Sequence, residues 1–289
     1  MTSRKLTIRY GTSLMPFFAK QIDAIGPTEA DLVTSTLFPD QRIAENPESA
    51  KLRRPSLSMI LSAIGDNKAL YLWQKTQIEE MGLGTFKSNM FERMGLGRDV
   101  HSKVEEMLKI RGEQGKTEAD IVKLIDSEKN AAIRNFMKSA LEVILNVQSP
   151  ELAICEQRIR HPKLAYQGRF DAVVKYNDNW CMLDWKTAPA RSSFSKQGDE
   201  SLSYETYVRQ LAAYAAAYNH DIRFENLPIA KQGILVSLKE DGSSAEVYQI
   251  SSDEMEKTLA EIIIRLKVFW SKLSSSKGAN VDFAYKPDN

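Results

Sequence analysis

Residues 168–186, which read GRFDAVVKYNDNWCMLDWK, decide the fold of this chain. Two apolar runs flank Asn177-Asp178, and both of these residues tolerate the positive φ angles of a two-residue hairpin turn. In that hairpin Tyr176 faces Asn179, and Asp171 falls directly opposite Asp184. The stretch therefore predicts two antiparallel strands that bring two carboxylates together.

Paired carboxylates at this end of a hairpin favour metal chemistry. Cross-strand neighbours lie within about 5 Å of each other at Cβ, so two ionised acids there repel unless a cation joins them. Mg²⁺ or Mn²⁺ prefers oxygen ligands and also accepts phosphate oxygens and water. Lys186 shares a face with Asp184 because side chains alternate along a strand. We expect Asp171, Asp184 and Lys186 to hydrolyse phosphodiesters; the alternative is an ordinary surface Asp–Lys ion pair.

The pattern on both sides of the hairpin predicts a mixed α/β domain. Apolar and β-branched runs predict strands over 152–159, 166–176 and 180–187. A predicted helix over 204–219, two strands joined by a turn at 240–242, and an amphipathic helix over 255–273 follow. We therefore expect a nuclease core over residues 151–289.

The N-terminal half of the chain predicts helices. Helical spacing of apolar residues covers 68–81, 98–109 and 118–147, within a helical region of residues 51–150. Residues 1–50 contain four prolines, at positions 16, 27, 39 and 47, and are expected to be mostly irregular.

Several polar residues outside the hairpin are candidates for the same site. His101 is a candidate metal ligand through its imidazole, or else a partly buried structural histidine. Glu156 lies in an apolar strand and so needs a metal or a partner such as Arg169. Gln210 and Tyr214 lie on one face of a helix, where they contact either the substrate or the core. The loop 188–203 is long and polar, holds Arg191 and Lys196, and reads either as a lid over the site or as a solvated connection.

Composition limits the remaining classes. The 289 residues are 43% apolar and carry a net charge of +1, so nucleic acid must bind through local basic surface. No apolar run reaches the roughly 18 residues of a membrane span. Two cysteines, Cys155 and Cys181, are too few for a disulfide framework or an iron–sulfur cluster. We expect both side chains to be buried in the protein core, and the protein to reside in a reducing compartment. No feature indicates an obligate protein partner.

The N-terminus is basic and rich in hydroxyl side chains, with Arg4, Lys5, Arg9 and Lys20 preceding the first acid, Asp23. This composition is typical of a mitochondrial transit peptide. The alternative is a basic tail on a cytoplasmic or nuclear protein.

The motifs now resemble those of one superfamily. The runs 168–171 (GRFD), 184–186 (DWK) and 210–214 (QLAAY) look like the PD-(D/E)XK nuclease signature in its RecB-like form, and 97–101 (GRDVH) resembles its extra histidine motif. The runs 54–61 (RPSLSMIL), 71–73 (YLW) and 232–236 (QGILV) resemble the mitochondrial genome maintenance exonuclease family. The likeness extends from about Arg54 to Leu273.

This resemblance implies a restriction-endonuclease-like core with a mixed central sheet flanked by helices and an N-terminal helical extension. It implies Mg²⁺- or Mn²⁺-dependent cleavage of single-stranded DNA from an end, in mitochondrial DNA replication or repair. By carry-over, His101, Asp171, Asp184 and the Trp185 carbonyl bind metal, and Lys186 is catalytic. The residues around Arg54 and Trp73 help to wall a channel for the strand. The alternatives are an endonuclease or an RNA-directed nuclease on the same core, or a non-catalytic nucleic-acid-binding domain.

Overall fold

The computed structural model describes residues 17–18, 26–65, 68–188, 201–275 and 280–281. A five-stranded sheet of order β2-β5-β6-β7-β8 forms its centre. The strands are β2 (Ile154–Cys155), β5 (Ala172–Tyr176), β6 (Asn179–Ala188), β7 (Gln232–Lys239) and β8 (Glu246–Ile250). β6 and β7 are parallel, while the other neighbouring pairs are antiparallel. The predicted mixed α/β architecture is therefore confirmed.

The predicted hairpin register is also found. Tyr176 pairs with Asn179, and the ladder runs to the pair of Ala172 and Leu183. Asn177 and Asp178 have φ angles of 47° and 61°, the left-handed conformation that a tight two-residue turn requires. Asp171 comes directly after the last paired residue of β5, at the level of Asp184 on β6.

The sequence predicts that the strands over 152–159 and 166–176 run without interruption through Glu156 and Asp171. This prediction is wrong. Glu156 has φ 52°, and the chain resumes as β3 (Arg158–Arg160), which pairs with β4 (Gln167–Arg169) in a separate two-stranded sheet. Phe170 lies between β4 and β5 and turns into the core, where it is 1% exposed and packs edge-on against Tyr218. Burial of this ring is the physical reason for the break.

Three helices cover one face of the main sheet: α6 (Leu83–Gly112), α7 (Glu118–Ser127) and α8 (Ala131–Leu145). Val104 and Met137 of these helices join Trp185 and Leu183 of β6 in one apolar cluster. α6 begins fifteen residues before the helix expected from Arg98. It is preceded by α5 (Lys68–Met81), whose bounds match the prediction.

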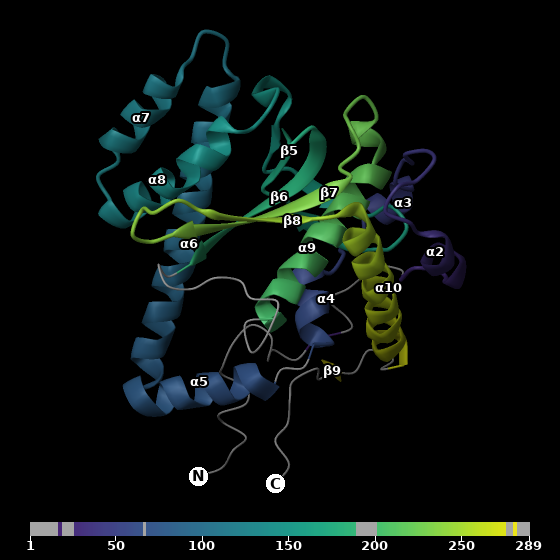
Figure 1. The fold of residues 1–289 in the computed structure, drawn as a ribbon. Helices are drawn as coiled ribbons and strands as arrows, with labels where there is room; N and C mark the ends of the chain where they lie inside the picture. The colour runs from purple at the N-terminus through teal and green to yellow at the C-terminus, as the bar shows by residue number, and fades with distance from the viewer. Residues whose placement is uncertain (1–16, 19–25, 66–67, 189–200, 276–279, 282–289) are drawn as a thin grey trace.

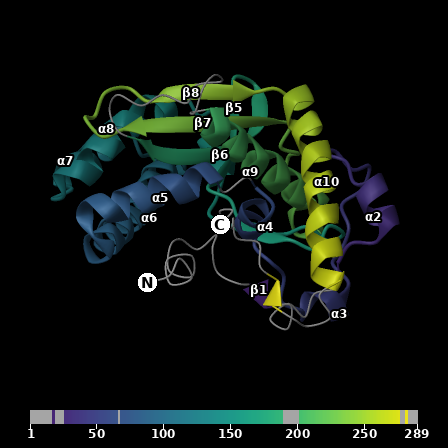
Figure 2. The same ribbon diagram turned by 90° about the horizontal axis from the view of Figure 1, so that it is seen from below.

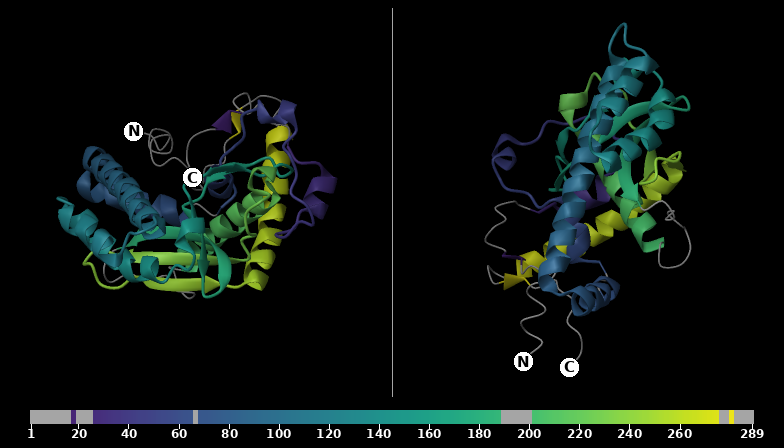
Figure 3. Two further views of the ribbon diagram at one scale, coloured as in Figure 1. Left: turned by 90° about the horizontal axis from the view of Figure 1, so that it is seen from above. Right: turned by 90° about the vertical axis from the view of Figure 1, so that its left-hand side faces the viewer.

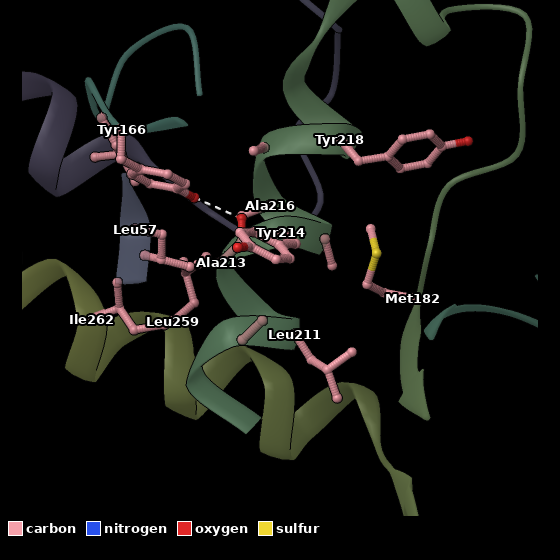
Figure 4. Close-up of a cluster of buried hydrophobic side chains, with 14 of the residues drawn as sticks. Leu57, Tyr166, Met182, Leu211, Ala213, Tyr214, Ala216, Tyr218, Leu259 and Ile262 are labelled. Carbon is pink, nitrogen blue, oxygen red and sulfur yellow. Dashed lines mark hydrogen bonds between the residues drawn. The ribbon is translucent and has the colours of Figure 1, made fainter. Parts of the chain in front are cut away.

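The other face is covered by α9 (Ser201–His220), α10 (Ser252–Ser275) and α4 (Leu57–Ala63). The alanines of α9 at 212, 213 and 215–217 are fully buried, and such small side chains allow close approach of its neighbours. Figure 4 shows this cluster, in which the Tyr166 hydroxyl donates a 2.7 Å hydrogen bond to the Ala213 carbonyl. Seen from below, α10 and α2 (Glu29–Thr34) lie on the side opposite α7 and α8 (Figure 2).

Short elements complete the described chain: α3 (Pro47–Ala50), the 3-10 turns at Pro150–Leu152 and Ile222–Phe224, and a pairing of β1 (Phe17–Phe18) with β9 (Asn280–Val281). Leu37, from the segment expected to be irregular, is 1% exposed. Cys181 is buried and Cys155 half-buried, and burial raises the pKa of both thiols to about 12. None of the described helices is long and apolar enough to cross a membrane. The basic residues at 4–9 and position 20, and loop residues 189–200, lie outside the described residues.

Candidate active site

The hairpin brings Asp171, Asp184 and Lys186 together. Asp171 Oδ2 accepts a 2.8 Å hydrogen bond from the backbone N–H of Trp185, so the acid at the end of β5 is fixed to the middle of β6. Asp184 is 3% exposed, and its Oδ2 lies 2.6 Å from Lys186 Nζ. Two acids and one ammonium therefore converge at one end of the hairpin.

His101 reaches this point from the helical face. Gly97, one turn earlier on α6, lies beside Thr187, since a Cβ added to it would meet Thr187 Oγ1 at 3.9 Å. A Cβ at that distance makes an ordinary van der Waals contact, so α6 and β6 adjoin here without requiring a glycine. His101 Nδ1 then lies 3.3 Å from Asp171 Oδ1.

Glu156 occupies the break between β2 and β3 and faces the same place. Its Oε2 lies 2.5 Å from Arg169 Nε, so the ion pair considered from the sequence is present. His101, Glu156 and Asp171 each offer one ligand atom, and these atoms all lie within 4.8 Å of one another.

These donors fit a divalent cation. Ligands at ~2.1 Å from a six-coordinate ion lie about 3 to 4 Å apart, and small side-chain movements bring the three atoms into that range. Asp184 Oδ2 is a further buried oxygen that accepts no hydrogen bond in acceptable geometry, although Lys186 lies beside it. Carboxylate oxygens with one imidazole suit Mg²⁺, Mn²⁺ or a similar metal.

Burial and mutual repulsion set the protonation of the site. Burial raises the pKa of Asp184 to about 6, and the negative charge of Asp171 adds to the rise, while Lys186 opposes it. Burial lowers the pKa of His101, but the hydrogen bond to Asp171 together with the negative charges of Asp171 and Asp184 outweighs burial, so that this pKa is raised. Burial also raises the pKa of Glu156. The site thus holds several carboxylates that are shielded from water and repel one another, and a bound cation reduces this repulsion.

The Lys186 ammonium contacts three side chains: Asp184, Gln210 and Tyr207. Its Nζ donates a 3.3 Å hydrogen bond to Gln210 Oε1 and lies 4.6 Å from the centre of the Tyr207 ring. Gln210 Nε2 in turn donates a 3.4 Å hydrogen bond to the Tyr214 hydroxyl. The acids raise the pKa of Lys186 against the opposing effect of burial, so the ammonium stays charged. The sequence places Tyr207 beside Gln210 and Tyr214 on one helical face, since it lies three residues before Gln210, but it gives Tyr207 no role in the site.

The first position of the GRFD motif, Gly168, requires glycine for a steric reason. A Cβ at this residue would lie 2.4 Å from Tyr214 Cε1, so only glycine lets β4 pack on that ring. Tyr214 is 6% exposed and belongs to the core, with its hydroxyl directed at Gln210. Of the two roles that the sequence left open, the structure shows the core role, with Gln210 as the polar partner of the hydroxyl.

Trp185 places its backbone at the site and its side chain elsewhere. The indole is 2% exposed, in the cluster beneath α6 and α8. The N–H and C=O of one residue in a strand point to the same side. Because the Trp185 N–H points to Asp171, its carbonyl faces the side where β5 has ended.

The profile of the family described as "PD-(D/E)XK nuclease superfamily" matches residues 71–282, which is most of the chain. This chain belongs to the PD-(D/E)XK nuclease superfamily. Its five-stranded mixed sheet flanked by helices is consistent with the restriction-endonuclease-like fold of that superfamily, as predicted.

Curated relatives share one name. Mitochondrial genome maintenance exonuclease 1 of Xenopus tropicalis is 27% identical over 202 residues, covering 69% of this chain and 52% of that protein. The Homo sapiens protein of the same name is 23% identical over 224 residues, covering 75% of this chain and 58% of that protein. This chain thus spans between half and three fifths of their length. The crystal structure of SSO0001 is 20% identical and covers 57% of this chain and 75% of its own, but its TM-score of 0.24 carries no weight for the fold.

Proposed function

We propose that this chain is a nuclease that uses Mg²⁺ or Mn²⁺ to hydrolyse single-stranded DNA from an end, in the maintenance of mitochondrial DNA. The observation that carries the proposal is the cluster of His101, Glu156 and Asp171, with ligand atoms within 4.8 Å of one another, beside the buried pair of Asp184 and Lys186. The preference for single strands and for ends, and the mitochondrial location, are supported by the names of the relatives.

In this proposal His101, Asp171, Asp184 and the Trp185 carbonyl hold the ion, and Glu156 either binds it or orients the other ligands. When bound, the ion supplies a Lewis acid for the phosphodiester and lowers the pKa of water. Lys186 keeps its proton at Nζ and presents it, from between Asp184 and Gln210, to a non-bridging phosphate oxygen. Gln210 and Tyr214 keep the ammonium in place.

The helical region of residues 51–150 is proposed as the wall of the substrate channel. Trp73 and Phe91 are 44% and 70% exposed on α5 and α6. Aromatic rings in such positions stack on unpaired bases, which a duplex does not offer. This is the feature of the chain itself that favours a single strand over a duplex.

The test uses end-labelled linear and circular single strands of DNA and RNA, incubated with Mg²⁺, with Mn²⁺ and with EDTA. We expect loss of label and shortening of the linear DNA with either metal, none with EDTA, and an intact circle. Cleavage of the circle indicates an endonuclease, and faster cleavage of RNA indicates an RNA-directed enzyme. Binding without any cleavage contradicts an enzymatic role. Imaging of the full chain fused at its C-terminus to a fluorescent protein tests the mitochondrial location.

A further inference from the structure

A cavity of about 610 Å³ opens on the outer face of the small β3–β4 sheet. Its charged lining consists of four arginines and one acid: Arg158, Arg160, Arg169, Arg223 and Glu45. The whole chain carries a net charge of only +1, so this concentration of arginine is a local property. Such a lining selects an anion with several acceptor oxygens.

The strand register creates this face. Arg158 pairs with Arg169 across the two strands, and Ile159 pairs with Gly168. Ile159 is 1% exposed and Gly168 faces Tyr214, so these two residues point inward. The arginines alternate with them and point outward. Like charges directly opposite each other destabilise a sheet, so Arg158 opposite Arg169 is an unfavourable pair, although Arg169 has Glu156 as a partner and Arg160 donates a 2.8 Å hydrogen bond to the Ala50 carbonyl.

Acidic partners neutralise only part of this charge. Arg169 is paired with Glu156, and Arg223 with Asp221. Glu45 is already paired with the buried Arg54, and Arg160 lies 3.7 Å from the same carboxylate. Arg158 is exposed and makes no ion pair within the described residues. The cavity therefore keeps a positive excess, centred on Arg158 and Arg160.

The cavity adjoins the candidate active site. Arg169 lines it and is the partner of Glu156, whose carboxylate lies within 4.8 Å of the Asp171 and His101 ligand atoms. Arg169 is also only two residues from Asp171. A strand with one phosphate at the metal donors therefore has a neighbouring phosphate within reach of the arginines.

We propose that this cavity binds a second phosphate group of the nucleic-acid strand, next to the one that is cleaved. The inference rests on the proposed function and deepens it by assigning a subsite of the substrate. Guanidinium groups bind phosphate through paired N–H donors, which matches the chemistry of the lining. The phosphate is either a backbone diester or the terminal monoester of a strand end, and both present the same oxygens.

The test compares Arg158→Gln with Lys123→Gln, and each substitution removes one positive charge. Lys123 is exposed on α7, which lies across the main sheet from the cavity (Figure 1). Affinity for labelled single-stranded oligonucleotides with and without a 5′-phosphate is measured in EDTA by fluorescence anisotropy at several salt concentrations. Michaelis constants are measured with Mg²⁺ for an oligonucleotide and for bis(p-nitrophenyl) phosphate, which has a single phosphate.

We expect Arg158→Gln to weaken oligonucleotide binding about five- to tenfold and to reduce the slope of log affinity against log salt by about 1. The oligonucleotide KM rises by a larger factor than the KM of the small diester. Equal loss for both oligonucleotides identifies a backbone phosphate, while loss confined to the phosphorylated one identifies a terminal phosphate.

If Arg158→Gln has the same affinity and salt slope as Lys123→Gln, the subsite is wrong. If the wild type still cleaves the strand in that case, the proposed function is not contradicted. An equal rise in KM for both substrates also overturns the subsite. A wild-type protein that neither binds nor cleaves nucleic acid contradicts the proposed function itself.

Discussion

The end of the β5–β6 hairpin and the arm formed by α5 with the first half of α6 place side chains in opposite environments. At the hairpin Asp184 is 3% exposed and held against Lys186. On the arm, which extends away from the sheet (Figures 1 and 3), the apolar side chains of Trp73, Phe91 and Met94 are 44%, 70% and 56% exposed. Charged groups are buried in one region and apolar groups are exposed in the other.

Both arrangements oppose folding stability, and this is what the comparison teaches. A buried carboxylate and ammonium lose hydration, and exposed rings gain nothing from the hydrophobic effect. The hairpin tolerates its charges because the packed sheet fixes their partners. On the arm Trp73 packs edge-on against Phe86, with ring centroids 6.0 Å apart, yet Trp73 stays 44% exposed and Phe91 70% exposed, which fits a surface that meets a ligand.

Removal of the ammonium is expected to have the largest effect. Lys186→Ala should lower kcat about 10²- to 10³-fold, because one charge-stabilising group is lost from the reacting phosphate. The measurement is the initial rate on end-labelled single strands, with oligonucleotide affinity as the control for folding. Turnover within a factor of three of wild type contradicts the role given to Lys186.

One pair of identical substitutions separates the two regions by stability. Phe170→Ala should lower the free energy of unfolding by about 3–5 kcal/mol, since the ring is 1% exposed and the cavity cannot close fully. Phe91→Ala should change it by no more than about 0.5 kcal/mol. Urea denaturation of both variants checks this. Equal losses show that the arm is part of the cooperative core.

The arm should matter for binding instead. Trp73→Ala should weaken the affinity for a single-stranded oligonucleotide about tenfold, because base stacking on an aromatic ring contributes ~1–3 kcal/mol. Leu72→Ala, at a neighbouring position that is 48% exposed, is the control without a π face and should weaken it less. Anisotropy titration in EDTA gives both values. If the two variants bind alike, stacking on the arm is absent.

The acidity of the hairpin site should appear in its response to pH. Asp184 titrates at about 6 and His101 above its usual range, so protons compete with the ion there, and metal affinity should fall about tenfold per pH unit below 6. In the metal-free protein the folded state holds the Asp184 proton more tightly than the unfolded state does. The stability from this group is therefore present below pH 4 and lost as the pH rises through about 6.

Calorimetric metal titrations between pH 5 and 8 measure the first effect, and metal-free unfolding between about pH 4 and 8 measures the second. Asp184→Asn is the control for both, because it removes the titrating carboxyl. A metal affinity independent of pH contradicts the assignment of these two residues.

The smallest predicted effect concerns Tyr207. Its ring lies 4.6 Å from Lys186 Nζ, and a cation–π contact contributes about 1 kcal/mol. Tyr207→Leu should lower kcat about fivefold with little change in KM, while Tyr207→Phe, which keeps the ring, should restore most of the rate. A larger loss in Tyr207→Phe than in Tyr207→Leu assigns the effect to the hydroxyl.

Local rules predicted the part of the site that lies on the hairpin. The turn residues Asn177 and Asp178 set the register, and the register brings Asp171 beside Asp184. The same rules failed at Glu156, whose positive φ is imposed by the burial of Phe170 and by the pairing of β3 with β4. Nothing in the local sequence signals this conformation, which glycine or asparagine adopts more often.

Helix α6 shows the same limit. Gly84, Gly95 and Gly97 weaken helix propensity by roughly 1 kcal/mol each, so the sequence predicts a start near Arg98. The observed helix starts at Leu83, where Phe86 in the first turn is buried against Trp73, and its later half packs in the core through Val100 and Val104. The sequence groups Tyr207 with Gln210 and Tyr214 but assigns it no role, because an aromatic residue on an amphipathic helix is indistinguishable from a core residue until Lys186 is placed.

Titration of the metal-free protein with Mn²⁺, followed by electron paramagnetic resonance, tests the central claim most directly. Wild type should bind at least one ion with an affinity that Asp171→Asn reduces at least tenfold, because Asp171 joins the His101 and Glu156 donors to the hairpin. Lys123→Gln should bind as wild type does. Equal Mn²⁺ affinity in wild type and Asp171→Asn contradicts a metal site built on this hairpin.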